Sequence, residues 1–201
     1  MMVIFRALDL THLDYCMFWA ACNLAYFGFL RLAEFTVPNL ASYVPAVHLG
    51  VADIAVDSRW SPSYLCLRIN ASKTDRFCKG CFLHIGKGEF LLCAIYSLLA
   101  YLTLRGDALG PLFLFRDGRL LSHALLTSWL RGILSAAGIQ GIFSCHGFRI
   151  GAATVAERNR ILDNQIQALG RWTSPAYLLY ICTPAESLSR LSKQLSLSAV
   201  H

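Results

Sequence analysis

Ser-Cys-His-Gly-Phe-Arg, residues 144–149, contains an imidazole and a guanidinium three positions apart, those of His146 and Arg149. Residues at i and i+3 of a helix lie on the same face, so both side chains can point at one phosphate. Tyr180 follows further along the chain, and a tyrosine hydroxyl can attack phosphorus and stay attached to it as a covalent intermediate. This combination suggests phosphoryl transfer on nucleic acid without hydrolysis.

Three further elements accompany this pair. Arg31 follows an apolar stretch and has Glu34 three residues later, which can hold it through an ion pair on one helical turn. Lys73 lies between two alternating, strand-like runs, so we expect it near the tip of a hairpin. Leu-Gly-Arg-Trp occupies 169–172 and precedes Tyr180. Taken singly, each element has a simple structural explanation, and only their combination indicates a site.

The order and approximate spacing of these elements resemble those of the tyrosine recombinase catalytic domain, the phage-integrase type. Four phrases look most like the eukaryotic branch carried by DIRS-type retrotransposons: Gly-Phe-Leu-Arg (28–31), Ala-Asp-Ile-Ala-Val-Asp-Ser (52–58), His-Gly-Phe-Arg-Ile-Gly-Ala-Ala-Thr (146–154) and Leu-Gly-Arg-Trp-Thr-Ser-Pro-Ala-Tyr-Leu-Leu-Tyr-Ile (169–181). The resemblance covers about residues 15 to 185. It implies a site-specific recombinase or integrase of a mobile element, which breaks and rejoins DNA through a 3′-phosphotyrosyl intermediate.

The resemblance also implies a role for each matched residue. Arg31 and Arg149 resemble the two arginines of the family that clamp the phosphate, and a planar, permanently charged fork suits that task. Tyr180 resembles the nucleophile. An unperturbed phenol has a pKa of about 10, so it needs help to lose its proton, and His146 is the candidate to assist. Lys73 resembles the general acid that protonates the departing 5′ oxygen.

Arg171 stands where many bacterial and phage relatives have a second histidine or a tryptophan. A guanidinium there could donate to a non-bridging oxygen with full positive charge. The adjacent Trp172 could donate through its indole N–H instead, so the sequence leaves open which of the two contacts phosphate. The Gly-Arg-Trp form looks ordinary for the DIRS-type branch and does not indicate inactivation.

The composition is that of a folded domain, and it agrees with a nucleic-acid partner without deciding it. The chain has 201 residues, of which 56% are hydrophobic and 15% charged, which favours one domain with a sizeable core over disorder. Its net charge of +6 has the sign expected for a nucleic-acid partner. The two most apolar stretches, 17–30 and 90–104, fall short of the ~20 residues that span a bilayer. We therefore expect buried helices, no membrane contact and no cofactor.

The eight cysteines require a check for metal binding. Cys78 and Cys81, with His84 and Cys93 downstream, superficially offer four zinc ligands. However, Cys81 and His84 lie three apart in a segment that predicts a strand, so their side chains point to opposite faces. We expect no metal site and free thiols in a reducing compartment, the nucleus or, if the chain is not from a nucleated cell, the cytosol.

The hydrophobic periodicity predicts helices and three short strands. The resemblance implies that they form an α+β fold, mainly helical, with a small three-stranded antiparallel sheet, as in the DNA breaking-rejoining enzymes. Strands are predicted at 50–56, 64–71 and 77–85. Helices are predicted at 11–29, after Arg31, at 89–104, at 122–137 with Ser122 as N-cap, from Asp163 as cap to Gly170, from Ser174 through Tyr180, and at about 184–193.

We expect residues 1–201 to form a single catalytic domain, with about 184–201 as a C-terminal helix and tail. The family's N-terminal helical domain, which closes a clamp around DNA, has no counterpart in this sequence. By resemblance, the C-terminal segment docks onto a neighbouring protomer, so the expected partners are double-stranded DNA and a second copy of the chain. The alternative is a catalytically silent DNA-binding or interaction fragment of a decayed or domesticated element, and a type IB topoisomerase is a third outcome.

Overall fold

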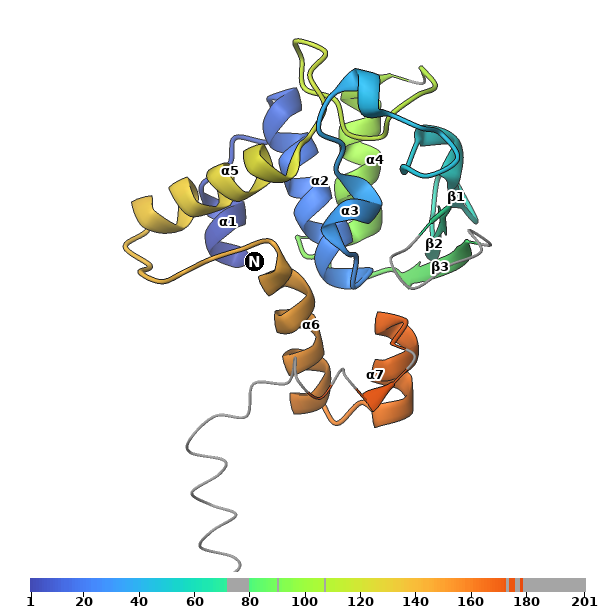
Figure 1. Ribbon diagram of the computed structural model, residues 1–201, viewed down its shortest axis with the longest axis vertical. Coiled ribbons are helices and arrows are strands. Elements are labelled where there is room, and N and C mark those ends of the chain that lie inside the picture. The colour runs from blue at the N-terminus through green and yellow to red at the C-terminus, as the bar shows by residue number, and fades with distance from the viewer. Residues whose placement is uncertain (72–79, 90, 107, 173, 176–177, 179–201) are drawn as a thin grey trace, which may run out of the picture. The chain divides into compact units, whose positions relative to one another are not determined.

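The computed structural model describes residues 1–71, 80–89, 91–106, 108–172, 174–175 and 178. The chain divides into two compact units, Met1–Arg149 and Ile150–His201 (Figure 1). Lys73, Tyr180 and the segment 184–201 lie outside the described residues. The helices predicted around Tyr180 and at 184–193 therefore stay predictions.

Two apolar helices form the centre of the first unit. α2 (Leu13–Phe27) and α4 (Ala94–Arg105) pack against each other (Figure 1). All residues of α2 from Cys16 to Ala25 are buried, so this helix is apolar on every side because the core surrounds it. The prediction that the two apolar stretches are buried helices is confirmed. Within the described part of the chain, no helix is long and apolar enough to cross a membrane.

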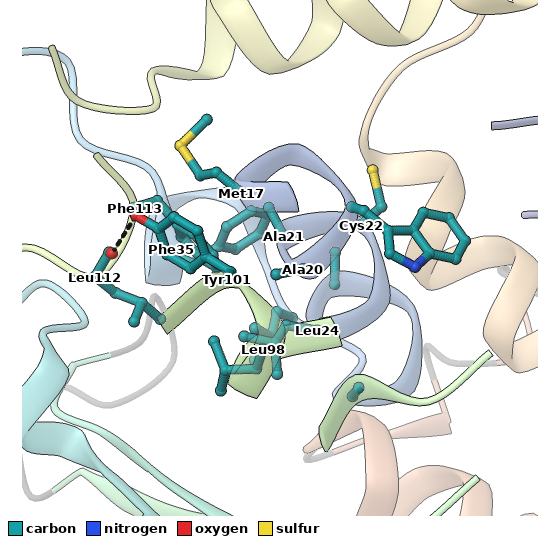
Figure 2. Close-up of a cluster of buried hydrophobic side chains, with 14 of the residues drawn as sticks. Met17, Ala20, Ala21, Cys22, Leu24, Phe35, Leu98, Tyr101, Leu112 and Phe113 are labelled. Carbon is teal, nitrogen blue, oxygen red and sulfur yellow. Dashed lines mark hydrogen bonds between the residues drawn. The ribbon is translucent and has the colours of Figure 1, made fainter. Parts of the chain in front are cut away.

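Tyr101 of α4 ties this core to the segment that follows. Its buried hydroxyl donates to the Leu112 carbonyl at 3.0 Å (Figure 2). The same hydroxyl accepts from the Leu114 amide at 2.9 Å. Its ring stacks on Phe113 with centroids 5.9 Å apart, and Phe113 contacts the ring of Phe35 at 6.1 Å. The polar end of a buried tyrosine is thus satisfied, as burial requires.

The other helical elements of this unit are short or peripheral. They are α1 (Met2–Arg6), α3 (Leu32–Phe35), the 3-10 turns η1 (Leu40–Ser42) and η2 (Val51–Asp53), α5 (His123–Ala136) and the first turn of α6 (His146–Arg158). α5 starts after Ser122, whose hydroxyl accepts from the Leu125 amide at 3.2 Å. The predicted N-cap is confirmed.

A small antiparallel sheet completes the first unit. Its strands, β1 (Ile54–Val56), β2 (Tyr64–Ile69) and β3 (Cys81–Gly86), pair in the order β1-β2-β3. Alternate residues point into the core, where α4 contacts both β2 and β3. The buried residues of these two strands are Leu65, Leu67, Ile69, Leu83 and Ile85. The predicted fold class is therefore confirmed.

Several predicted boundaries differ from the observed ones. The first strand was expected from Gly50, but the Asp53 carboxylate accepts from the Gly50 amide at 2.8 Å and turns 51–53 into η2. The helix expected from residue 89 begins only at Ala94, after a turn in which the Leu92 amide donates to the Glu89 carbonyl. The second strand ends at Ile69 rather than at residue 71.

The second unit contains the rest of α6 and α7 (Asp163–Gly170). The prediction that Asp163 caps α7 is wrong, because Leu162 is the N-cap and Asp163 is the first helical residue. The Leu162 amide donates to the side-chain oxygen of Gln165 at 3.3 Å, which satisfies one of the free amides at the helix start. A carboxylate at the first helical position still favours the helix, since it faces the positive end of the dipole.

Candidate active site

The turn between α2 and α3 carries the first candidate arginine. α2 gives way to this turn at Gly28, where a Cβ would lie 2.7 Å from the Leu24 carbonyl oxygen and 3.0 Å from Cδ2 of Leu83. Phe29 then adopts a left-handed φ of 48°, which is uncommon for a residue other than glycine. The chain reverses tightly here and places Arg31 at the start of α3.

Glu34 holds Arg31 at two points. The backbone N–H of Arg31 donates to one carboxylate oxygen at 2.8 Å, and its Nη1 donates to the other at 3.1 Å. The Glu34 side chain is 2% exposed and that of Arg31 is 21% exposed. The predicted i,i+3 ion pair is confirmed, and because the carboxylate is buried, it fixes the direction in which the guanidinium points.

Arg149 is tied to the same turn from a distant part of the sequence. It lies in the first turn of α6 and is 2% exposed. Its Nη1 donates to the backbone carbonyl of Phe29, two residues before Arg31. This carbonyl positions the guanidinium and, unlike a carboxylate, does not neutralise its charge. Both candidate arginines are therefore attached to one short segment.

α5 positions the start of α6. Arg131 donates from Nε to the Phe143 carbonyl at 2.8 Å, and the Thr127 hydroxyl lies 3.3 Å from the sulfur of Cys145. Cys145 is buried among core residues. These contacts fix the loop directly before His146. They therefore set the position of the first turn of α6, which carries His146 and Arg149.

His146 and Arg149 lie one helical turn apart, as predicted, but in different environments. His146 is exposed, whereas Arg149 is buried. Partial burial of the imidazole and, second, the charge of Arg149 lower the pKa of His146 below its ordinary value of 6.5. The lowered pKa favours the neutral imidazole, which is the form that can accept a proton.

Arg171 and Trp172 belong to the second unit, at the end of α7. A Cβ at Gly170 would lie 1.6 Å from the Trp172 ring, so the indole packs directly on this glycine. Arg171 has a left-handed φ of 54° and ends the helix. The Gln167 carbonyl accepts from the Trp172 amide at 3.0 Å, and its side chain donates to the Trp172 carbonyl at 3.1 Å. The Leu-Gly-Arg-Trp element is thus a compact local structure.

In the first unit, one turn holds Arg31 and Arg149, and His146 lies one helical turn before Arg149. Lys73 and Tyr180, the predicted acid and nucleophile, lie outside the described residues. Sequence reasoning missed Phe29, because its contribution is a backbone carbonyl and the preceding glycine is the only local signal. Two guanidiniums beside a neutral imidazole can bind a phosphodiester and stabilise the charge that develops on its oxygens.

No metal centre is found in the described part of the chain, where no group of three or more His, Cys, Asp or Glu side chains could hold an ion. On β3, His84 is exposed on the face opposite to that of Cys81, which agrees with the alternation predicted from the sequence. Cys78 lies outside the described residues.

The fold has counterparts among solved structures, although no family model and no curated protein matches the sequence. The chain is similar to a XerH site-specific recombinase bound to palindromic difH substrate in a post-cleavage complex, with a TM-score of 0.67 and 16% identity over 94% of this chain and 49% of that one. A XerA recombinase matches with a TM-score of 0.65 and 19% identity, over 96% of this chain and 61% of that one. A lambda integrase dimer bound to a COC′ core site matches with a TM-score of 0.59 and 17% identity, over 92% of this chain and 57% of that one.

This chain therefore spans about half to three-fifths of the length of the structures that it matches. At these low identities the likeness concerns the fold. The mainly helical architecture with its three-stranded antiparallel sheet is the fold of tyrosine recombinase catalytic domains.

Proposed function

We propose that this chain is the catalytic part of a tyrosine-type DNA recombinase or integrase, which breaks and rejoins double-stranded DNA. The observation that carries the proposal is the α2–α3 turn, which holds Arg31 through Glu34 and Arg149 through the Phe29 carbonyl. The XerH and lambda integrase structures, which have a similar fold, contain their DNA sites. That likeness supports DNA as the partner.

In the proposed reaction, Arg31 and Arg149 bind the non-bridging oxygens of one phosphodiester and stabilise their growing charge. The Tyr180 oxygen attacks phosphorus, and neutral His146 assists the loss of the phenolic proton. The bond from phosphorus to the 5′ oxygen breaks, and Lys73 protonates that oxygen. The 3′ phosphate stays on Tyr180 until a 5′-hydroxyl attacks it, which rejoins DNA and releases the tyrosine.

The same proposal includes the expectations that rest on sequence resemblance. Arg171 or Trp172 supplies a further donor to the phosphate. Residues 184–201 mediate self-association on DNA. An origin in a DIRS-type mobile element, with action in the nucleus, fits the phrases at 28–31, 146–154 and 169–181.

A covalent trap tests the proposal. A duplex that the chain binds is first selected from a random-sequence library. A nick placed in that duplex then lets the 5′-hydroxyl fragment diffuse away, so a cleaving enzyme stays attached and is detected on a denaturing gel. We expect mass spectrometry to locate the DNA on Tyr180, with no adduct for Tyr180→Phe and a normal adduct for Tyr177→Phe. Tight binding of the duplex without any adduct would favour the catalytically silent module.

A further inference from the structure

The face of the sheet that points away from α4 carries exposed aromatic side chains. Phe82 is 68% exposed and Tyr64 is 44% exposed, although both belong to well-paired strands. Arg68 and His84 are exposed on the same face. Exposed rings on a regular surface, accompanied by a cation, are typical of an interaction site. We call these four residues the outer sheet face; in Figure 1 the sheet lies on the side of its unit opposite to α5.

The strand register places these side chains next to one another on two neighbouring strands, β2 and β3. Arg68 of β2 lies opposite Phe82 of β3, and Cys66 lies opposite His84. The His84 ring lies against that of Tyr64, with centroids 5.8 Å apart and an interplanar angle of 53°. Successive residues on one face of a strand are about 6.6 Å apart, roughly twice the ~3.4 Å rise of stacked bases. This spacing matches that of a base placed between the side chains of Phe82 and His84.

The charge of this surface is complementary to a nucleic acid backbone. The three strands contain no acidic residue, and Arg68 supplies a positive charge beside Phe82. The Asp57 carboxylate, in the β1–β2 connection outside the strands, accepts from the amides of Ser63 and Tyr64 at 2.9 and 3.1 Å. Aromatic rings beside a cation are the arrangement that stacks bases and attracts phosphates.

From this arrangement we propose that the outer sheet face binds single-stranded DNA. Bases stack on Phe82, His84 and Tyr64, and Arg68 contacts a phosphate. Base-paired DNA keeps its base faces inside the stack, so rings that stand on a sheet can reach them only in an unpaired strand. The binding goes beyond strand cleavage and requires neither Tyr180 nor Arg31, so it stands or falls independently of the proposed enzymatic function.

Fluorescence anisotropy of the full chain tests this proposal. The probes are a labelled oligo-dT of about 12 nucleotides and an abasic strand of the same length and charge. We expect tighter binding of oligo-dT, and a loss of about 5- to 150-fold for Phe82→Ala on oligo-dT, the range for one stacked base, with no change on the abasic strand. Arg68→Ala should weaken both probes and reduce the salt dependence of log K by about 0.7.

Two control variants remove an exposed apolar side chain and an exposed arginine from other parts of the surface. Leu109→Ala deletes an apolar side chain that is 78% exposed, and Arg119→Ala deletes an exposed arginine. Both should bind oligo-dT as the wild type does. Phe82→Leu keeps an apolar residue in β3 and loses only the ring, so it should behave as Phe82→Ala if both fold.

Tyr180→Phe separates this proposal from the enzymatic one, because it removes the proposed nucleophile and no phosphate-binding group. It should bind oligo-dT normally while the covalent adduct is lost. Equal binding of oligo-dT and the abasic strand by the wild type would overturn the proposal, and so would wild-type binding by Phe82→Leu. A dimer that dissociates in Phe82→Ala, seen by sedimentation together with unchanged oligo-dT binding, would assign the face to a second copy and equally overturn it.

Discussion

α2 and α7 end in related ways, and each end carries an arginine of the candidate site. At α2, Gly28 is followed by Phe29 with φ 48°, and at α7, Gly170 is followed by Arg171 with φ 54°. Both glycines are closely packed, but against different groups. A Cβ at Gly28 meets backbone, the Leu24 carbonyl, whereas a Cβ at Gly170 meets a side chain, the Trp172 ring.

The two ends differ in the sequence separation of the contacts described for them. The α2–α3 turn contacts Leu83 of β3 and binds Arg149 of α6 through Phe29, both far away in sequence. The end of α7 is closed by bonds between Gln167 and Trp172, five residues apart. Changes at the α2 end should therefore affect the whole unit and the proposed chemistry, and changes at the α7 end should be felt in α7 itself.

The largest expected effect concerns the two arginines that the α2–α3 turn holds. Arg31→Ala and Arg149→Ala should each slow formation of the covalent adduct by at least ~100-fold, the scale for loss of one preorganised donor to a developing charge. The lysine replacements should also lose activity, because they keep the charge without the fork. The adduct is followed with time on the nicked duplex. Wild-type rates in both alanine variants would contradict the phosphate-binding role.

Gly28→Ala tests whether the turn is as tightly fixed as its contacts indicate. A Cβ 2.7 Å from a backbone oxygen forces α2 or β3 to shift, so we expect a loss of about 1–3 kcal/mol in the free energy of unfolding, measured with urea. Gly132→Ala in α5 is the matched control, since a Cβ there meets nothing within 4 Å. That control should gain about 0.5–1 kcal/mol. Unchanged stability of Gly28→Ala would show that the turn is adaptable.

At the α7 end, the expected effect is smaller and changes sign with context. Gly170→Ala displaces the Trp172 ring and should destabilise α7. In a Trp172→Ala background the obstruction is gone, and the same Gly170→Ala should stabilise α7 by about 0.5–1 kcal/mol, as alanine does in a helix. Hydrogen exchange at the α7 amides measures both. Additive effects of the two substitutions would mean that the ring does not pack on Gly170 in solution.

The local features of the molecule could be predicted from the sequence, whereas contacts between distant residues could not. Helices and strands followed from hydrophobic periods, which act locally, and the ion pair of Arg31 with Glu34 followed from spacing on one helical turn. The bond from Arg149 to the Phe29 carbonyl was not predictable, because it joins residues far apart in sequence and one partner is backbone. A left-handed Phe29 and Arg171 were also unexpected, since their side chains do not favour that conformation.

Boundaries were missed where a side chain competed with the regular pattern. Asp53 turned the start of the first expected strand into a 3-10 turn by accepting from Gly50. At α7, the amide side chain of Gln165 satisfied the helix start, so Asp163 was not needed as a cap. Such local bonds decide where an element begins, whereas hydrophobic periodicity decides only that it exists.

The smallest expected effect is on the pKa of His146, which reports whether the Arg149 guanidinium lies near the imidazole in solution. Its pKa is lowered by partial burial and, second, by Arg149. An NMR titration of the imidazole protons should therefore give a midpoint below 6.5, and Arg149→Met should raise it.

The sign for stability follows from proton binding. Below pH 6.5 the unfolded chain takes up this proton more readily than the folded one, so the contribution of His146 is present above that pH and is lost as the pH falls through the folded pKa. Titration at or above 6.5 in the wild type would contradict this arrangement. An unchanged midpoint in Arg149→Met would mean that burial alone sets the pKa.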